Sequence, residues 1–337
     1  MGDLVTARVR VRAAVDTATT LLTDAGLEEE PAARTAHAIV LAEVWGIPSH
    51  GLLRLPYYLE RLAAGGCNPT ASLTATTDTG PLLAFDGEDG LGHWQLWEAA
   101  TLVQQRCAQY GIAAATVSAS SHCGALGIYT LPGLSADQVS LVFSNGPAVM
   151  PPWDGHAPLL STSPIAAGIP CGERAAIIDL ATSVVARGRI AAAARRGAPL
   201  EAGWAFTRDG EPTTDAAEAL EGMLAPLGGA KGYALAFLVE ALTGGLAGPA
   251  LSPDVADMLD SGQAARAQRI GHLVLSLDPA VVGPGAPGRL VELAERAMSS
   301  GGRIPGGART LPEQLSDEDT VDLDENTWAT VQRLARA

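Results

Sequence analysis

Cysteine and positive charge are both scarce in this chain of 337 residues. Its four cysteines, Cys67, Cys107, Cys123 and Cys171, are far apart and never form a Cys-x-x-Cys pair. This spacing argues against a disulfide framework or a cysteine metal site, and it predicts buried, reduced thiols. The formal net charge of −15 argues against nucleic acid as a partner, because binding phosphates requires a basic surface.

Long uninterrupted apolar runs are also missing, although 47% of the residues are hydrophobic. No stretch long enough to cross a membrane is free of charged and polar residues. The first residues, Met1 to Val5, lack the basic region and apolar block of a secretory signal, and Asp3 makes N-myristoylation at Gly2 a poor fit. We therefore expect a cytoplasmic protein with no membrane partner.

The Gly-x-Gly-x-x-Gly fingerprint of the common dinucleotide-binding fold is absent as well. Two other segments are candidates for binding an anion. Residues 228–232 (GGAKG) place Lys231 among backbone amides at a predicted helix start, although the spacing does not suit a triphosphate site. Residues 303–309 (RIPGGAR) form the second candidate loop. From spacing alone, the first segment is equally consistent with a glycine-capped turn, and the spacing of the second favours an ordinary surface turn.

The apolar pattern predicts a mixed α/β chain without a regular alternation of strands and helices. The predicted helices cover residues 6–22, 30–44, 94–110, 183–196, 232–246 and 288–299. The predicted strands cover residues 82–85, 112–117, 139–143, 177–180 and 273–277. The Pro/Gly-rich segment 145–170 is expected to be an irregular binding loop, and the acidic segment 313–325 a solvated surface.

Two serine-histidine pairs stand out, each with a glycine close behind: Ser49-His50-Gly51 and Ser121-His122-Cys123-Gly124. Histidine exchanges protons near neutral pH, and a neighbouring hydroxyl can orient its ring. We expect Ser49 to cap a helix that places Arg54 one turn beyond His50, where its guanidinium suits a carboxylate. These residues predict an acid/base site for a small carboxylic acid. The alternatives are a purely structural role for His50 and, less favoured, a nucleophilic Cys123.

Eight short motifs, in order, make the chain resemble the malate/L-lactate dehydrogenase family of non-Rossmann type. They are SHGLLR (49–54), SHCGALG (121–127), STSPIA (161–166), DLATS (179–183), ARGRI (186–190), PTTD (212–215), PLGGAKGY (226–233) and RIPG (303–306). This family also includes sulfolactate and ureidoglycolate dehydrogenases and cyclic-imine carboxylate reductases.

The resemblance implies an α/β fold with a mixed, non-Rossmann NAD(P)-binding sheet and helical N- and C-terminal arms, assembled as a homodimer. Three parts are expected. Residues 1–75 form the N-terminal helical arm, residues 76–250 the central NAD(P)-binding region, and residues 251–337 the C-terminal strand and arm that complete the substrate lobe. The implied activity is hydride transfer between NAD(P)H and a small 2-oxo/2-hydroxy acid or cyclic 2-imino acid, without a metal. A non-catalytic binding or structural subunit is the alternative.

The resemblance also implies roles for particular residues. The substrate-binding residues would be Arg54, Thr162, Arg187 and Gly188. The cofactor-binding residues would be His122, Cys123, Gly124, Ala125, Leu126, Asp179, Leu180, Ala181, Ala230, Lys231, Arg303, Pro305, Gly306 and Arg309. Proton transfer would fall to His50, oriented by Ser49, or to His122. The other histidines, His37, His93, His156 and His272, are expected to be structural or surface residues.

Five positions depart from the pattern usual in the family. Pro48 stands where an aspartate commonly precedes the first Ser-His pair, and Ser121 stands where an asparagine often precedes the second histidine. Cys123 follows that histidine, and Ala230 replaces an aromatic residue or histidine. Arg189 stands where the cyclic-imine reductases carry an aspartate that completes a relay, and it matches the basic residue usual in the hydroxy-acid dehydrogenases. The sequence therefore leaves the substrate, and the choice between NAD and NADP, open.

Overall fold

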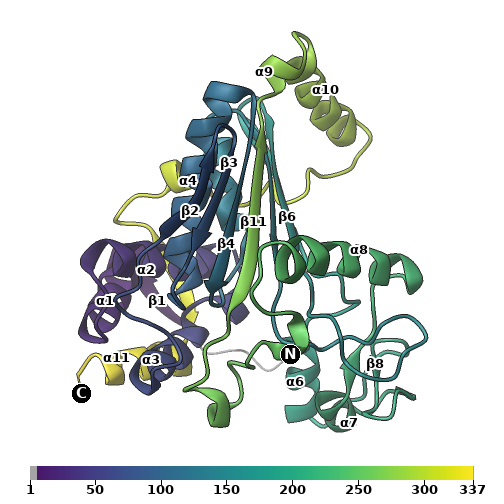
Figure 1. Ribbon diagram of the computed structural model, residues 1–337. Coiled ribbons are helices and arrows are strands. Elements are labelled where there is room, and N and C mark those ends of the chain that lie inside the picture. Colours follow the sequence, from purple (N-terminus) through teal and green to yellow (C-terminus); the bar gives the residue numbers. More distant parts are fainter. Residues whose placement is uncertain (1–5, 337) are drawn as a thin grey trace.

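The computed structural model describes residues 6–336, so the N-terminal residues discussed above lie outside the described part (Figure 1). The strands are β1 (Thr6–Arg10), β2 (Thr74–Thr79), β3 (Leu82–Asp86), β4 (Ile112–Ser120), β5 (Val139–Ser144), β6 (Ile165–Cys171), β7 (Arg174–Leu180), β8 (Ala205–Phe206), β9 (Pro212–Thr213), β10 (Met223–Leu224), β11 (Ile270–Leu277) and β12 (Thr320–Asp324). The helices are α1 (Val11–Asp24), α2 (Glu29–Val44), α3 (Leu55–Ala64), α4 (Gly92–Tyr110), α5 (Leu131–Leu134), α6 (Arg187–Arg195), α7 (Ala216–Glu221), α8 (Ala230–Glu240), α9 (Pro279–Val282), α10 (Ala286–Ser299) and α11 (Glu325–Leu334). Short helical turns include η1 (Pro48–His50), η2 (Leu52–Arg54), η3 (Leu126–Thr130), η5 (Ser252–Asp254) and the π-turn η4 (Ala241–Gly245).

A seven-stranded mixed sheet forms the centre of the molecule, in the order β2-β3-β4-β11-β5-β6-β7. Its strands are antiparallel except for the parallel pair β3 and β4. The late strand β11 lies between β4 and β5, so a segment from the C-terminal third of the chain completes the middle of the sheet. This topology confirms the expected mixed sheet.

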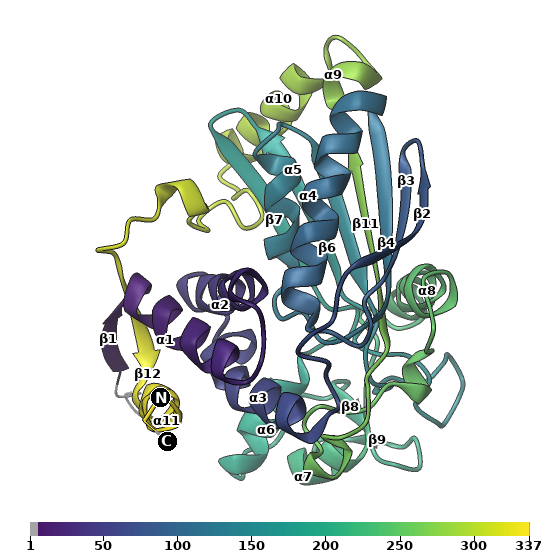
Figure 2. The same cartoon turned by 60° about the vertical axis from the view of Figure 1, so that its left-hand side comes forward.

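Helix α4 covers one face of the sheet, and α8 lies on the other side at one end of the sheet (Figures 1 and 2). The main core lies between α4 and the sheet and includes Phe85, Val103, Val117 and Val274. Alternate residues of β4 are buried, which is the pattern of a strand packed on one face. A separate, smaller core joins α6, α7 and the small sheet β10-β8-β9, at the lower right of Figure 1.

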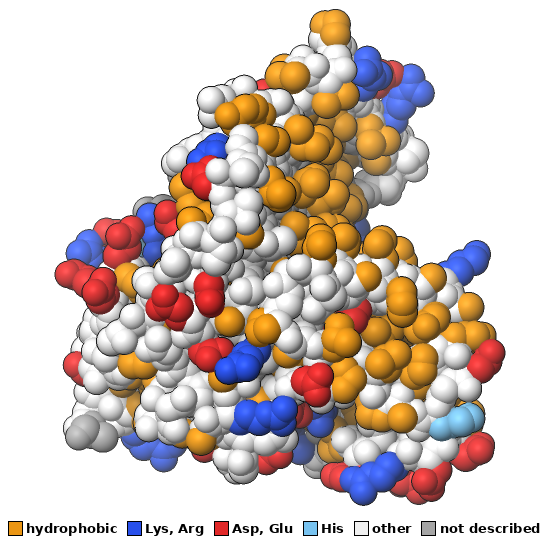
Figure 3. Space-filling view, in the orientation of Figure 1, with side chains coloured by type: hydrophobic (Ala, Val, Ile, Leu, Met, Phe, Trp, Pro, Cys, Tyr) orange, Lys and Arg blue, Asp and Glu red, His pale blue; other side chains and the backbone are white. Residues whose placement is uncertain are grey.

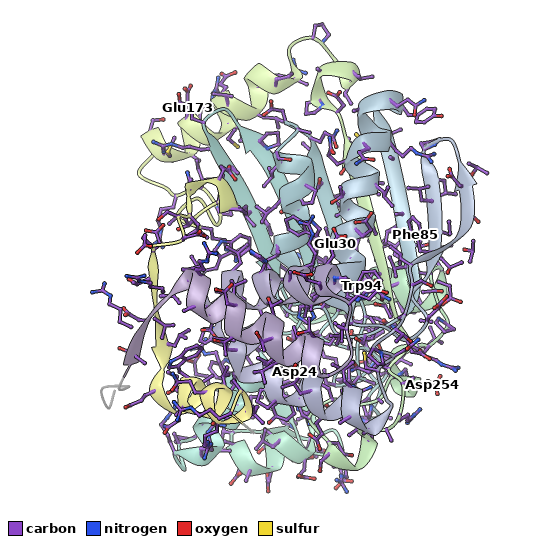
Figure 4. The ribbon with its side chains drawn as sticks, turned by 90° about the vertical axis from the view of Figure 1, so that its left-hand side faces the viewer. Asp24, Glu30, Phe85, Trp94, Glu173 and Asp254 are labelled. Atoms are coloured by element: carbon purple, nitrogen blue, oxygen red, sulfur yellow. The ribbon has the colours of Figure 1, made fainter. Side chains whose placement is uncertain are left out.

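The N-terminal helices and the C-terminal end of the chain form one helical arm around a second core. This core unites Leu22, Ile39, Leu52 and Tyr58 with Leu323 of β12. Trp94, at the start of α4, packs against it from the side of the sheet (Figure 4). The arm therefore holds the turn at residues 48–54 against the central sheet.

The predicted helix at residues 6–22 is wrong over its first five residues. They form β1, which pairs antiparallel with β12 and buries Val9 between exposed neighbours. The same pairing corrects the acidic segment 313–325, because Val321 and Leu323 are buried within it. The segment 145–170 also differs from expectation, since its last residues, from Ile165, belong to β6.

The expectation that Ser49 caps a helix is also wrong. Two 3-10 turns, η1 and η2, precede α3, which begins only at Leu55. The Ser49 hydroxyl lies against the His50 ring, and the Glu43 carboxylate accepts the backbone N–H of Leu52. The four cysteines are free and buried, as predicted. None of the helices described between residues 6 and 336 is sufficiently long and apolar to span a membrane.

Candidate active site

The turn between α2 and α3 carries three of the predicted site residues. Ser49 and His50 lie in η1, and Arg54 ends η2. The Nε of Arg54 donates a hydrogen bond to the Ser49 carbonyl at 2.8 Å, and Ser49 Oγ lies 3.0 Å from Nδ1 of His50. One serine therefore orients both the guanidinium and the imidazole. No ion pair within the described chain includes Arg54, so its terminal nitrogens are available to a ligand.

The second Ser-His motif lies at the same place, because the loop after β4 brings His122 to η1. The His50 and His122 rings are stacked, with centroids 5.7 Å apart and planes inclined by 14°. Tyr58 of α3 also reaches His122, with its Oη 2.8 Å from Nδ1. The two histidines that sequence reasoning singled out thus form one cluster.

The hydrogen bonds of His122 define its tautomer. The backbone N–H of Gly124 donates to Nδ1 of His122 at 3.2 Å. A backbone N–H can only donate, so Nδ1 is an acceptor and the neutral ring carries its proton on Nε2. The Tyr58 hydroxyl consequently also donates to Nδ1. A protonated His122 would lose the bond from Gly124, since its Nδ1 would carry a hydrogen, while the Tyr58 hydroxyl would have to turn and accept that hydrogen.

Burial lowers the pKa of both histidines. Burial, with a smaller effect of the Arg54 charge, lowers the pKa of His50 to about 4. Burial and then the neighbouring His50 lower the pKa of His122 well below its ordinary value. Burial raises the pKa of the Tyr58 hydroxyl, which keeps its proton. At neutral pH both imidazoles of the free protein are therefore uncharged beside a cationic Arg54.

Two further histidines, His93 and His272, lie close to His122. The His93 ring, at the start of α4, lies edge-on to the Tyr58 ring, with their centroids 4.8 Å apart. The centroids of the His93 and His122 rings are 6.4 Å apart. His272 of β11 is fully buried, with Nε2 3.2 Å from the Ser121 carbonyl. Burial lowers the pKa of His93 to about 3 and that of His272 to about 4. Within residues 6–336, no group of His, Cys, Asp or Glu side chains is arranged to hold a metal ion.

Three of the predicted cofactor segments meet at β7. The Gly127 N–H donates to Asp179 Oδ2 at 2.8 Å, which joins the loop after His122 to the end of this strand. The Ile177 N–H donates to the Pro305 carbonyl at 2.9 Å, so residues 303–309 lie along the strand. Gly306 has a φ of +63°, and a Cβ there would overlap the Ile177 carbonyl. Only glycine allows this close approach.

A cavity of about 490 Å³ opens beside these segments, lined by Val44, Trp45 and residues 303–309. The Arg309 guanidinium lies 4.8 Å over the Trp45 ring. Burial raises the pKa of Asp179, although the Gly127 N–H and Arg309 oppose this shift. The cavity thus combines an aromatic face with cationic groups, which suits a nucleotide.

The loop before α8 holds Lys231, the only lysine in the chain. Gly228 and Gly229 both have positive φ, and α8 begins directly after them with Ala230 and Lys231, both exposed. The Leu227 N–H donates to the Thr182 carbonyl, and the Thr182 N–H donates to the Thr162 carbonyl. Backbone hydrogen bonds therefore connect this loop to the predicted substrate residue Thr162.

Two predicted substrate residues, Arg187 and Gly188, are the first residues of α6. Within the described chain, no hydrogen bond or ion pair joins either of them to His50 or His122. The Arg187 guanidinium forms an ion pair with Asp257 at 2.6 Å, so its charge is already partnered. Gly188 is exposed with open space around it. Cys123, Ala125 and Leu126 turn their side chains into the core, which leaves only their backbone for a ligand. Leu180 is exposed and Ala181 half-buried beyond Asp179.

The residues present fit a nicotinamide nucleotide. The aromatic cavity, the arginines at 303 and 309 and the glycine-lined start of α8 are all suited to its base and phosphates. The histidine pair and Arg54 supply proton-exchanging and carboxylate-binding groups beside these segments.

Comparison with known proteins gives the family. The malate/L-lactate dehydrogenase family matches residues 9–332. The chain belongs to this family. It is 32% identical to the (2R)-3-sulfolactate dehydrogenase (NADP(+)) of Chromohalobacter salexigens, over 92% of this chain and 96% of that protein. It is 33% identical to the Delta(1)-pyrroline-2-carboxylate reductase of Ancylobacter novellus, over 93% of each chain. The delta1-piperideine-2-carboxylate reductase of Pseudomonas syringae pvar. tomato has a similar structure, with a TM-score of 0.89, 30% identity and coverage of 98% of this chain and 100% of that one.

These relatives confirm the family, the fold and the class of reaction predicted from the sequence. The protein is an NAD(P)-dependent oxidoreductase of small 2-hydroxy or 2-imino acids. The sequence analysis did not identify Tyr58 or Trp45 as site residues. The spacing held a signal for Tyr58, because it follows Arg54 by four residues, and such residues share one face of a helix.

Proposed function

We propose that Arg54 holds the substrate carboxylate while His50 transfers the proton that accompanies hydride transfer. A nicotinamide, when bound, supplies or accepts the hydride. The observation that supports this most strongly is the double use of Ser49: its carbonyl orients Arg54 and its hydroxyl orients His50. A carboxylate on Arg54 would present the neighbouring oxo or imino carbon beside His50.

The hydrogen-bond partners favour His50 over His122 as the proton carrier. The Ser49 hydroxyl can accept from a protonated Nδ1 or donate to an unprotonated one by rotating its O–H. His122 has no such freedom, because the Gly124 N–H faces its Nδ1 in every protonation state. We therefore assign His122 a fixed role: its Nε2–H donates a hydrogen bond to the substrate or the cofactor.

The cofactor is proposed to bind across the segments that meet at β7. The adenosine and phosphate groups would be held by the cavity beside Trp45 and by Arg303, Pro305, Gly306 and Arg309, with Asp179, Leu180 and Ala181 along the strand. The backbone of residues 122–126 and the loop with Ala230 and Lys231 would contact the remainder. Thr162, Arg187 and Gly188 are proposed to complete the substrate side.

Turnover assays test this proposal. The absorbance of NADH and of NADPH is followed against a panel of 2-oxo acids, including oxaloacetate, pyruvate and sulfopyruvate, and against cyclic imine carboxylates. The reverse reactions are followed with the corresponding hydroxy acids. We expect oxidation of at least one reduced cofactor with one class of acid. Cofactor binding without turnover of any panel member would favour the alternative, a non-catalytic subunit.

We further propose that a second copy of this chain covers an apolar face that includes α8. Three large side chains of this helix, Leu235, Phe237 and Leu238, are 44%, 54% and 50% exposed. Figure 3 shows hydrophobic side chains continuing from α8 over the neighbouring surface. Such a patch on a water-soluble protein usually marks an interface. Light scattering should give a dimer for the wild type and a smaller species for Phe237→Asp, and a monomeric wild type would contradict the homodimer.

We propose a cytoplasmic location. The free, buried cysteines are consistent with a reducing compartment. Fractionation of the producing cells, followed by immunodetection of this chain, tests the proposal, and recovery outside the cytoplasm would contradict it.

A further inference from the structure

Glu43 is a buried carboxylate directly beneath the turn that carries His50 and Arg54. It lies near the end of α2, and only 8% of its surface is exposed. Its Oε1 accepts a hydrogen bond from the backbone N–H of Leu52 at 2.7 Å. No ion pair in the described chain includes Glu43, so its main polar contact is with this turn.

The contact falls at the junction between the two short helical turns. The His50 N–H donates to the carbonyl of Ile47, the residue before η1, and the Arg54 N–H donates to the Gly51 carbonyl at the junction. Leu52 begins η2, so its N–H has no partner inside that turn. The carboxylate of Glu43 satisfies this orphan donor from outside the turn.

Glu43 is also packed tightly against the chain at this point. A Cβ added to Gly51 would overlap the side-chain carboxyl group of Glu43. Gly51 separates the turn that holds His50 from the turn that holds Arg54. The angle between these turns is therefore set by a side chain that, within the described chain, forms no hydrogen bond or ion pair with the imidazole or the guanidinium.

We propose that Glu43 is a positioning residue, which fixes the distance between His50 and Arg54 by holding the Gly51-Leu52 junction. This inference rests on the roles proposed above for His50 and Arg54. If the junction loosens, a bound carboxylate no longer places its reacting carbon beside the imidazole. A misplacement of this kind is worth about ten- to a hundredfold in rate.

Three substitutions at this position separate the acceptor from the charge. Glu43→Ala removes the acceptor, and we expect kcat/KM for the 2-oxo or imino acid to fall about ten- to a hundredfold. Glu43→Gln keeps an oxygen of the same reach and should restore kcat/KM to within about threefold of wild type, since a neutral carbonyl still accepts the Leu52 N–H. Glu43→Asp keeps the charge but retracts it, and should behave like Glu43→Ala.

Glu240 provides a matched control. It is also a buried carboxylate, 7% exposed, and its Oε1 accepts the N–H of Ser252 at the start of η5, again at 2.7 Å. It lies on α8, across the sheet from the helical arm. Glu240→Ala should lower the thermal stability while leaving kcat/KM within about threefold of wild type, because its hydrogen-bond partners, Asn145 and Ser252, are not among the proposed site residues.

A binding measurement without turnover provides the second readout. Oxamate, an unreactive 2-oxo acid analogue, is titrated calorimetrically in the presence of reduced cofactor. We expect its Kd to rise about tenfold or more in Glu43→Ala, while the Kd of the cofactor alone stays within about twofold. If Glu43→Ala does not fold, Gly51→Ala tests the same contact, since its methyl group displaces the Glu43 carboxyl, and it should impair oxamate binding equally.

The outcomes separate the two proposals. A wild type that oxidises no reduced cofactor with any panel acid overturns the proposed function. An active wild type overturns only the positioning role if Glu43→Ala keeps its kcat/KM and oxamate affinity, if Glu43→Gln is as impaired as Glu43→Ala, or if Glu240→Ala shows the same loss. Selective loss with rescue by Glu43→Gln supports it.

Discussion

Single residues decide the chemistry of this protein, and the two stacked histidines are the central case. They have the same type of side chain and similar burial, yet different partners. Ser49 can follow a change in the protonation of His50, whereas the Gly124 N–H holds His122 in one tautomer. The assignment of roles therefore depends on one hydroxyl and one backbone amide.

The first prediction concerns these histidines directly. His50→Ala should lower kcat about 10²- to 10⁴-fold, the usual contribution of a positioned proton donor, with little change in cofactor affinity. His122→Ala should retain more activity and weaken binding. His37→Ala, at an exposed histidine of α2, is the control. A dead His122→Ala together with a nearly normal His50→Ala would show that the proton carrier has been misassigned.

The second prediction concerns the effect of Arg54 on His50. The guanidinium helps to lower the pKa of His50 to about 4, so Arg54→Met should raise that pKa in the free protein. Binding of a carboxylate to Arg54 of the wild type should also raise the pKa of His50, because the carboxylate offsets the positive charge of the guanidinium. This binding should therefore be accompanied by proton uptake. NMR titration of the His50 ring signals measures both effects. An unchanged His50 pKa in Arg54→Met would show that the charge of Arg54 does not act on His50.

At the scale of secondary-structure elements, the sequence predicted those whose apolar residues follow one regular period. Helix α4 and strand β7 lie where they were expected, because each packs one face against the main core. Strands β1 and β12 were missed because each gains its partner only from the opposite end of the chain. No local pattern contains that information.

The site was predicted unevenly for the same reason. Ser49, His50 and Arg54 are close in sequence and could be recognised as a group. The Ser121-His122 pair and the two glycine-rich loops were also recognised from the residues, and the resemblance to a family supplied the remaining cofactor segment at residues 179–181. Tyr58 and Glu43 act through contacts across elements, with His122 and Leu52. The spacing of Tyr58 from Arg54 indicates a shared helix face, but the partner of neither residue can be read from spacing. The division of the chain into three parts remains a prediction.

The third prediction tests the pairing of the two chain ends. Leu323 of β12 is 1% exposed in the core of the helical arm. Leu323→Ala should lower the free energy of unfolding by about 2–5 kcal/mol, the usual range for a buried leucine. Asp322→Ala, on the exposed face of the same strand, should change it by less than about 1 kcal/mol. Equal effects in urea unfolding would contradict the pairing.

At the scale of the whole molecule, two buried histidines, His93 and His272, and two half-buried ones, His50 and His122, make stability depend on pH. The folded-state pKa values of His50, His93 and His272 are lowered to about 4, 3 and 4, and that of His122 is lowered as well. The unfolded chain takes up protons near the ordinary histidine value, which the folded protein does not. The free energy of unfolding should therefore fall as the pH drops below about 6.5.

The fourth prediction isolates one of these contributions. Within the described residues neither ring nitrogen of His93 has a hydrogen-bond partner. His93→Leu therefore replaces the titrating imidazole by an apolar side chain of similar size without breaking a hydrogen bond. Between about pH 7 and about pH 5.5 the wild type should lose about 1 kcal/mol more than His93→Leu. Urea unfolding at both pH values measures this difference. Equal losses would show that His93 does not resist protonation.

The most direct test of the whole account is a crystal structure of the protein with reduced nicotinamide cofactor and oxamate. We predict that the oxamate carboxylate contacts the Arg54 guanidinium, with the adjacent carbonyl oxygen within hydrogen-bond distance of His50 and its carbon facing the nicotinamide ring. A complex in which the carboxylate binds elsewhere, or in which His50 points away from the ligand, would contradict the account.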